Sequence, residues 1–356
     1  MSETRHPFAR IAAILALMSA ALCGCASGSG FSSQPNGVRL NAPADGALAS
    51  PVWMPDGYLY FIFLPNVAPP GQALTSSLWR VRPGGKAQRV RWKPSGVCPR
   101  ADYGALTRLP DGRLGLVRTC RPGGTALLVD DLVALDTKTR VESVLARFPQ
   151  LPAINLYAWK PGLAGGFVSD ETGECAAIWP IVHGAPGQFP VPVTIDGHSW
   201  RLDQGMGQAL HEGLGTCTGY GKATAPVVMD GGELMFVASG AVQGVSDGVT
   251  REGAPWGLYR WDLTGQPRKV IGGIRHLTGY ALSRDQRTVA IGGNIRGTLG
   301  LWLVDLATGK ARQVGGAGVE CVDPAFNDSG TKVVCSWQKS ENDGELWMIN
   351  TSSGAR

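Results

Sequence analysis

The chain has 356 residues, of which 50 are Gly and 24 are Pro, and 44% of its residues are hydrophobic. So much Gly and Pro excludes a mainly helical protein, while the hydrophobic fraction, with 11 Trp, is ample for a packed core. The 33 basic and 28 acidic residues are spread along the chain and give a net charge of +5. This balance argues against nucleic acid as a partner, because binding it usually requires a dense basic stripe.

The N-terminus has the pattern of an export signal. Arg5 and Arg10 precede an apolar run, residues 11–22, that is too short for an ordinary membrane span. The run ends in Leu-Cys-Gly-Cys, residues 22–25, which resembles a bacterial lipobox. The resemblance implies cleavage before Cys25, acylation of its thiol and firm retention at a membrane. Plain secretory cleavage nearby, with an incidental Cys, is the alternative.

This pattern sets the expected organisation of the first part of the chain. We predict a lipoprotein signal peptide over residues 1–24 and a flexible tether over residues 25–36, which is rich in Gly and Ser. The location that follows is extracytoplasmic, lipid-anchored to a membrane of the bacterial cell envelope.

The rest of the chain consists of six imperfect copies of one unit. Each copy has a turn rich in Asp, Pro and Gly between two apolar strands, and then a further apolar strand that in most copies carries Trp. The turns lie at residues 53–57, 108–112, 159–162, 228–231, 282–286 and 326–330. The copy at 277–316 is the clearest, because its four short apolar runs, each closed by turn residues, predict a four-stranded antiparallel meander.

The sequence pattern of the unit resembles the repeat of TolB-like, or WD-repeat-like, six-bladed propellers. It consists of Trp-x-Pro-Asp-Gly, an apolar strand and then Leu-Trp-x-x-Asp-x-x-Thr-Gly. The resemblance covers about residues 37–354. It implies an all-β fold, a six-bladed β-propeller of four-stranded antiparallel blades within a domain over 37–356. The predicted blades span 50–93, 103–147, 154–197, 223–273, 277–316 and 321–354.

The last unit is short of an outer strand, whereas residues 37–41 alternate like one. We therefore predict that an N-terminal strand within residues 37–43 pairs with the last blade, closes the ring and covers an unpaired edge.

The cysteines are expected to be oxidised after export. With Cys23 removed and Cys25 lipidated, an even set remains, which in an oxidising compartment indicates disulfides: Cys98, Cys120, Cys175, Cys217, Cys321 and Cys335. In a propeller, the entry to an inner strand and the loop after the second strand lie on the same face. This geometry predicts the pairs 98–120, 175–217 and 321–335, although spacing alone leaves every other connectivity open.

The sequence offers few candidates for catalysis or metal binding. Residues 244–248 match Gly-x-Ser-x-Gly, but they lie in a glycine-rich loop with no helix after them, so we interpret them as a loop. His183, His198, His211 and Glu212 lack the usual zinc-ligand spacing and are interpreted as surface residues. The acidic stretches 170–174 and 341–345 are interpreted as simple turns rather than calcium sites. We predict no catalytic residue, no metal and no cofactor.

Two features are candidates for contact with a partner. The long irregular stretch 184–215 is expected near the upper face, where Phe189, Trp200 and, just beyond it, Tyr220 would suit ligand or partner contact. The alternative is a cap that only covers the blade edge. The second feature is a basic cluster in the outer half of the first blade: Arg80, Arg82, Lys86, Arg89, Arg91 and Lys93. Its alternation is typical of a solvated outer strand, and attraction to anionic lipid headgroups is a secondary hypothesis.

The leading hypothesis is a membrane-anchored lipoprotein whose propeller is a binding scaffold for a protein or cell-wall partner. The alternative is an extracytoplasmic lyase or hydrolase that acts on a polysaccharide or peptide at the channel mouth, since propellers carry both kinds of function. The sequence favours a protein without enzymatic activity and does not name its partner.

Overall fold

The computed structural model of the chain describes residues 34–68, 75–95, 98, 101–109, 111–120, 129–149, 153–155, 163–170, 173–182, 185–186, 191–195, 198–202, 209–211, 222–229, 233–239, 255–262, 268–340 and 343–352. The predicted signal peptide, Cys25 and most of the predicted tether lie outside these residues. All the regular structure described is β. Within these residues, no helix is long and apolar enough to cross a membrane.

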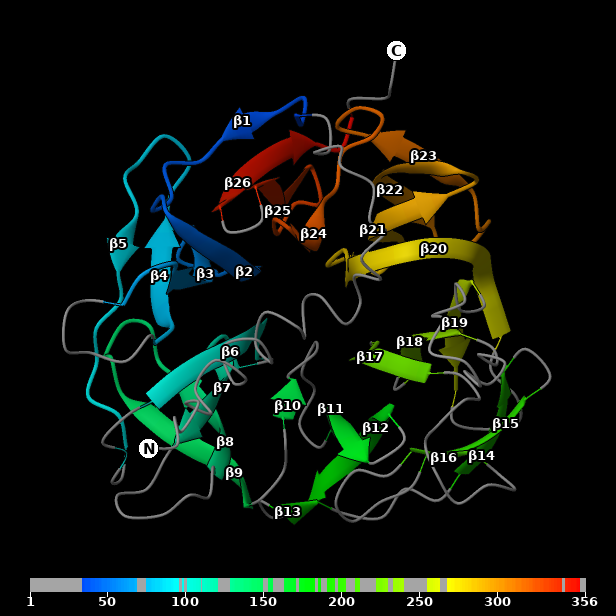
Figure 1. Ribbon diagram of the computed structural model, residues 1–356, viewed down its shortest axis with the longest axis horizontal. Helices are drawn as coiled ribbons and strands as arrows, with labels where there is room; N and C mark the ends of the chain where they lie inside the picture. Colours follow the sequence, from blue (N-terminus) through cyan, green and yellow to red (C-terminus); the bar gives the residue numbers. More distant parts are fainter. Residues whose placement is uncertain are drawn as a thin grey trace, which may run out of the picture.

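The strands form antiparallel sheets arranged around a common centre (Figure 1). The first sheet contains β2 (Gly46–Trp53), β3 (Leu59–Pro65), β4 (Ser77–Val81) and β5 (Gln88–Arg89). The second contains β6 (Ala101–Arg108), β7 (Leu114–Cys120), β8 (Val129–Leu135) and β9 (Glu142–Pro149). The next contains β10 (Ala153–Asn155), β11 (Leu163–Asp170), β12 (Gly173–Val182) and β13 (Ala185–Pro186). Each of these sheets follows chain order, which is the meander expected from the repeats.

Many of the strands are short, largely buried apolar runs, such as the first five residues of β3 and the first four of β7, and turn residues follow them. Gly57, Gly112 and Gly330, at the ends of three predicted turns, all have positive φ, which Gly adopts without steric cost. In the same turns, for example, the backbone N–H of Gly57 donates to the carbonyl of Met54 at 3.0 Å. These three turns therefore connect the inner strand to the second strand in the first, second and last sheets, as predicted.

One sheet has seven strands and joins two of the predicted units. It contains β17 (Lys222–Val228), β18 (Leu234–Ser239), β19 (Trp256–Trp261), β20 (Arg268–Leu282), β21 (Thr288–Ile295), β22 (Thr298–Asp305) and β23 (Ala311–Val314). The predicted boundary between the units 223–273 and 277–316 falls within β20, which is continuous: its first half pairs with β19 and its second half with β21. Ile274 and Leu277 are both buried there, which favours extended structure across the junction.

The stretch 184–215 is also more regular than predicted. Besides β13 it contains β14 (Val191–Ile195), β15 (His198–Leu202) and β16 (Ala209–His211), which form a small sheet of their own. Ile195 pairs directly with His198, and the two residues between them in the sequence are Asp196 and Gly197. Asp-Gly between alternating residues is a strong hairpin signal. The interpretation of this stretch as irregular was therefore wrong for a reason visible in the sequence.

The N-terminal strand completes the last sheet. β1 (Val38–Arg39) pairs antiparallel with β26 (Asp343–Asn350), followed in the sheet by β25 (Lys332–Ser340) and β24 (Val322–Phe326). The backbone N–H of Leu40 extends this pairing, donating to the carbonyl of Leu346 at 2.9 Å. The chain then reaches the first sheet, where Asn41 forms a parallel bridge with Lys86. The edge of β26 is thus covered by residues from the opposite end of the chain.

The hydrophobic core lies between neighbouring sheets. One cluster joins Leu48 and Phe61 of the first sheet to Val334 and Leu346 of the last. Others lie between the first and second sheets and within the seven-stranded sheet. Since burying one such side chain contributes about 1.5–3 kcal/mol, these clusters hold the first sheet against the second and against the last.

Candidate functional site

The strands nearest the centre share an irregularity. In Figure 1, β2, β6, β17, β20 and β24 lie on the inner side of their sheets, and each contains a register shift typical of a β-bulge. Four non-glycine residues at these shifts have positive φ: Ser50 at 50°, Ala105 at 39°, His276 at 48° and Asp323 at 49°. Such backbone is costly and persists where its surroundings hold it, often near functional sites.

Proline gives these bulges a sequence signal. Ser50-Pro51, Ala225-Pro226 and Asp323-Pro324 fall at the shifts in β2, β17 and β24. Proline has no N–H to donate, so within sheets it occurs at edges and bulges. A small or acidic residue followed by Pro, just before three of the six turn markers, could have located these three inner strands and their bulges from the sequence.

Asp323 connects the last sheet to the first. Its Oδ2 accepts a hydrogen bond of 3.0 Å from the backbone N–H of Ser50. On its other side, a Cβ added at Gly279 would lie 3.1 Å from the backbone N of Asp323, so β20 approaches β24 closely. Burial raises the pKa of Asp323, and the hydrogen bond from Ser50 acts in the opposite direction.

Asp102 and Ser76 make a similar connection between the first and second sheets. Ser76, buried before β4, donates its backbone N–H to Oδ1 of Asp102 at 2.9 Å. The hydroxyl of Ser76 also donates to the carbonyl of Tyr103 at 2.8 Å and accepts from the N–H of Tyr103. Burial raises the pKa of Asp102, partly offset by Ser76.

The third connection joins β20 to the segment before β24. His276 Nε2 lies 2.8 Å from Glu320 Oε1, and the hydroxyl of Thr278 donates to the carbonyl of Cys321 at 2.6 Å. A Cβ at Gly292 would come to 1.9 Å from that carbonyl, so the approach requires Gly. The polar groups of the inner strands therefore join one sheet to the next.

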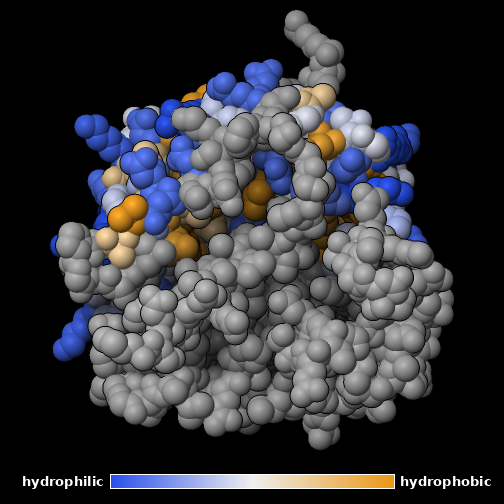
Figure 2. Space-filling view, viewed as in Figure 1, coloured by the Kyte–Doolittle hydropathy of each residue, from blue (hydrophilic) through white to orange (hydrophobic). Residues whose placement is uncertain are grey.

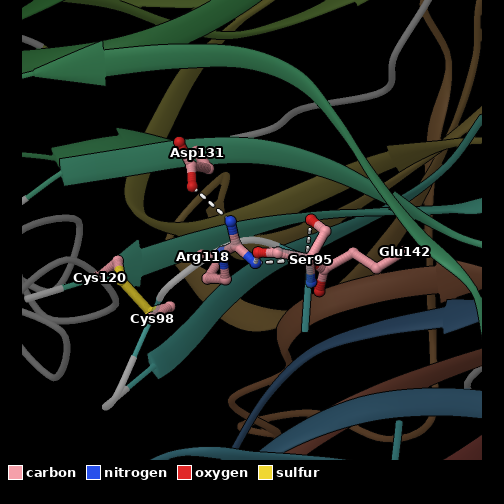
Figure 3. The surroundings of a disulfide bond; sticks show 6 residues. All are labelled: Ser95, Cys98, Arg118, Cys120, Asp131 and Glu142. Carbon is pink, nitrogen blue, oxygen red and sulfur yellow. Dashed lines mark hydrogen bonds and ion pairs between the residues drawn. A yellow bond between two sulfur atoms is a disulfide. The ribbon is translucent and has the colours of Figure 1, made fainter. Parts of the chain in front are cut away.

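A buried charge cluster lies in the second sheet (Figure 3). Arg118, 1% exposed, donates from Nη2 to Oδ2 of Asp131 at 2.6 Å and from Nη1 to Oε1 of Glu142 and to the carbonyl of Ser95. Glu142 also accepts from Ser95 N–H at 3.0 Å and from Trp92 Nε1 at 2.7 Å. Two carboxylates thus share one guanidinium, and further donors satisfy Glu142.

The same region holds a disulfide. Cys98 and Cys120 are bonded, with their Cα atoms 5.6 Å apart, close to the charge cluster (Figure 3). Tyr103, packed on Trp92 at 4.9 Å between ring centroids, has its pKa raised to about 12 by burial and by Glu142. Together the disulfide and the ion cluster attach the connection between the first and second sheets to β7.

The residues predicted as sites are distributed as follows. The disulfides Cys98–Cys120 and Cys321–Cys335 are present with the predicted partners, the second with a Cα separation of 5.4 Å. Cys217, Phe189, Tyr220, His183, Glu212 and residues 244–248 lie outside the described residues, so the pair 175–217 stays a prediction. The register of β15 and β16 places Trp200 opposite His211.

Sequence reasoning missed the inner-strand groups. Asp323, Ser50, Asp102 and the cluster around Arg118 were not singled out. Charged residues within apolar runs, such as Arg118 after Leu114–Val117, were the signal for the cluster. Among the described residues, no group of three or more His, Cys, Asp or Glu is arranged to hold a metal ion.

Comparison with known proteins identifies the fold. The sequence matches no protein-family model and no curated protein. An α-L-arabinofuranosidase from Fusarium graminearum superposes with a TM-score of 0.53 at 9% identity, covering 89% of this chain and 98% of that one. An acylaminoacyl peptidase gives a TM-score of 0.50 at 12% identity, covering 86% of this chain and 51% of that one.

TolB from Acinetobacter baumannii gives a TM-score of 0.48 at 15% identity, covering 84% of this chain; the match spans 64% of the TolB chain. At such low identities, likeness to solved structures shows the fold alone. The α-L-arabinofuranosidase likeness and the antiparallel sheets around one centre show that this chain is a β-propeller.

Proposed function

We propose that this protein is a membrane-anchored extracytoplasmic lipoprotein whose propeller is a binding scaffold for a protein or cell-wall partner. The observation that carries the proposal is the place of β1. This strand follows the predicted tether almost at once and is hydrogen-bonded to β26 in the last sheet. A lipid on Cys25 would then be attached to the folded frame by a segment that extends to roughly 40 Å at most.

The architecture that we propose is a closed ring of six four-stranded blades. The seven-stranded sheet would contribute two of them, with β20 serving as the outer strand of one and the inner strand of the next. β1 would supply the fourth strand of the sixth blade, so that both ends of the chain meet in one sheet. Closure of this kind leaves no open edge between first and last blades.

The contacts between sheets support a scaffold. Asp323 with Ser50, Asp102 with Ser76, and His276 with Glu320 each join neighbouring elements around the centre. A ring joined in this way holds its loops at fixed positions, which is what a rigid binding surface requires. The two disulfides support an extracytoplasmic location, because such bonds persist in oxidising compartments.

The proposal is tested on intact cells. Chemical crosslinking in membranes followed by pull-down of the full-length protein should recover a specific partner, and mass spectrometry of the mature N-terminus should find an acylated Cys25. The variant Cys25→Ser should lose both the lipid and retention at the membrane. An unmodified N-terminus would overturn the anchor.

The competing hypothesis is catalysis at the channel mouth. Purified protein is incubated with polysaccharides and peptides and the products are analysed by mass spectrometry. Turnover of a substrate, together with no partner above background in the pull-down, would replace the scaffold by a hydrolase or lyase.

A further inference from the structure

The outer edge of the first sheet presents a row of cations. Arg89, Arg91 and Lys93 are exposed, whereas Val90 between them is 4% exposed. The alternation continues past the end of β5, because Val90 still donates its N–H to the carbonyl of Leu78 on β4 at 2.8 Å. Successive side chains of an extended segment point to opposite sides, so all three cations face away from the core.

Three further cations lie on β4 and the following turn. Arg80 pairs with Gln88 and Arg89 with Trp79, so Arg80 and Arg82 extend from the other face of the same sheet edge. Arg80 and Arg82 both stack on the ring of Tyr58, with their Cζ atoms 4.2 and 4.1 Å from its centroid. Lys86 is exposed in the turn between β4 and β5. We call the whole group the basic rim: Arg80, Arg82, Lys86, Arg89, Arg91 and Lys93.

The charges of the basic rim are not neutralised locally. Among the described residues, none of the six forms an ion pair with a carboxylate, whereas Arg39, Arg108 and Arg113 elsewhere on the surface each have one. Arg80 donates to the side-chain amide oxygen of Gln88, and Arg82 to the backbone carbonyl of Asp56. These contacts hold the guanidinium groups in place and leave their charge available.

Protection of an edge strand does not account for so many cations. Basic side chains on outer strands discourage pairing with other molecules, and one or two suffice. The outer strand β23 carries a single cation, Arg312, and β1 carries Arg39, which is paired with Glu345 at 3.3 Å. The basic rim exceeds both in number and in unpaired charge.

The basic rim also lies next to the segment that leads from the predicted anchor. After β1 the chain runs against β5: the carbonyl of Asn41 accepts from Ala87 N–H at 3.0 Å, and its side chain lies 3.4 Å from the carbonyl of Gly85. In Figure 2, hydrophilic side chains predominate along the rim of the molecule over β1 and β5. A tether of this length averages roughly 20 Å as a random coil, which keeps this edge near the bilayer.

We propose that the basic rim docks on anionic lipid headgroups of the membrane that carries the anchor and so sets the orientation of the propeller. This inference rests on the proposed lipid anchor. Each Lys or Arg near an anionic surface contributes roughly fivefold to the equilibrium, and the attraction falls off within about 8 Å at physiological salt. Docking of the basic rim would fix the orientation of the propeller on the membrane, although the tether is flexible. The opposite edge of the ring would then face away from the bilayer.

The experiment uses the full-length lipidated protein in vesicles of phosphatidylcholine alone or with added phosphatidylglycerol. Hydrogen exchange of the segment 80–93 should be slower on the anionic vesicles, and high salt should abolish the difference. The variant Arg89→Gln/Arg91→Gln/Lys93→Gln should lower the docked-to-undocked ratio by roughly 100-fold, since three charges are lost.

The matched control is Arg287→Gln/Arg296→Gln/Lys310→Gln, which removes the same charge from exposed positions of the seven-stranded sheet. It should keep the protection of segment 80–93. Insertion into both vesicle types with identical exchange would overturn the inference, as would protection by an acidic cell-wall polymer or acidic protein but not by anionic lipid.

Failure of the anchor gives a different result. If the purified protein carries no lipid, the proposed function fails, and the rim is then tested by cosedimentation of that protein with the two vesicle types. Stronger binding to anionic vesicles, lost in the rim variant alone, would support the rim; equal binding to both would overturn it.

Discussion

Asp323 and Ser50 lie 273 positions apart in the sequence, yet Oδ2 of Asp323 accepts the backbone N–H of Ser50 at 3.0 Å. Both residues lie at bulges with positive φ, one on the inner strand of the last sheet and one on that of the first. The carboxylate of Asp323 thus accepts the backbone N–H of Ser50, which the bulge in β2 leaves without a partner in its own sheet. This contact joins the inner strand of the first sheet to the inner strand of the last, near the centre of the molecule.

The first prediction concerns the pH dependence of stability. Because burial raises the pKa of Asp323, the folded protein binds this proton more readily than the unfolded chain does. The stability that this proton contributes is fully present below the pKa of Asp323 in the unfolded chain. It is lost as the pH rises through the higher pKa of Asp323 in the folded protein. Asp323→Asn keeps an acceptor for Ser50 and cannot ionise. It should therefore show a smaller loss of stability above about pH 4 in urea titrations at several pH values.

The control for this prediction is Asp323→Ala, which removes the acceptor and leaves the Ser50 N–H without its partner. It should cost about 1–3 kcal/mol. If the Asn variant were as unstable as the Ala variant at neutral pH, the hydrogen bond would not be the role of this side chain.

The second prediction concerns the buried charge cluster. Arg118→Met leaves the carboxylates of Asp131 and Glu142 buried without their cation, which should cost about 3–5 kcal/mol in the free energy of unfolding. The matched change is Arg113→Met, which breaks an ion pair with Asp111 at a partly exposed position. That pair should be worth less than about 1 kcal/mol. Equal losses in urea unfolding would contradict the difference in burial.

The third prediction concerns the N-terminal strand. Leu40 is 3% exposed and belongs to the cluster that joins the first and last sheets, so Leu40→Ala should cost about 2–5 kcal/mol. Val38, two residues earlier, is 55% exposed, and Val38→Ala should change stability by less than about 0.5 kcal/mol. Deleting residues 37–43 should remove the cooperative thermal transition. An unchanged melting temperature after deletion would refute closure of the ring by this strand.

The fourth prediction concerns the disulfides. Peptide mapping without reduction should recover Cys98 with Cys120 and Cys321 with Cys335, and it also tests the predicted pair of Cys175 with Cys217. Replacing both members of the first pair by Ala should cost about 2–4 kcal/mol, because the bond restricts the unfolded chain over 22 residues. The pair 321–335 closes 14 residues and should contribute slightly less. A different connectivity in the peptide map would refute the predicted pairing.

Local signals carried most of the fold prediction. Turns such as 53–57 and 108–112 lie where their Asp, Pro and Gly predicted, and the outward cations of 89–93 follow from alternation alone. The continuity of β20 was not predicted, because Gly272-Gly273, which lies within it, is as typical of the end of a strand as of its interior. The Asp-Gly signal for the pairing of β14 with β15 was present in the sequence, but it was interpreted as part of an irregular stretch.

The sequence by itself determined where most of the strands and turns lie, since these depend on residues close together in the chain, whereas spacing alone left the pairing of the cysteines open. Only the tertiary structure decided what the polar groups do. Whether Asp323 meets Ser50, or Arg118 meets Asp131 and Glu142, depends on strands brought together by packing. Their burial, and therefore the direction of each pKa shift, is a property of that packing and not of any local pattern.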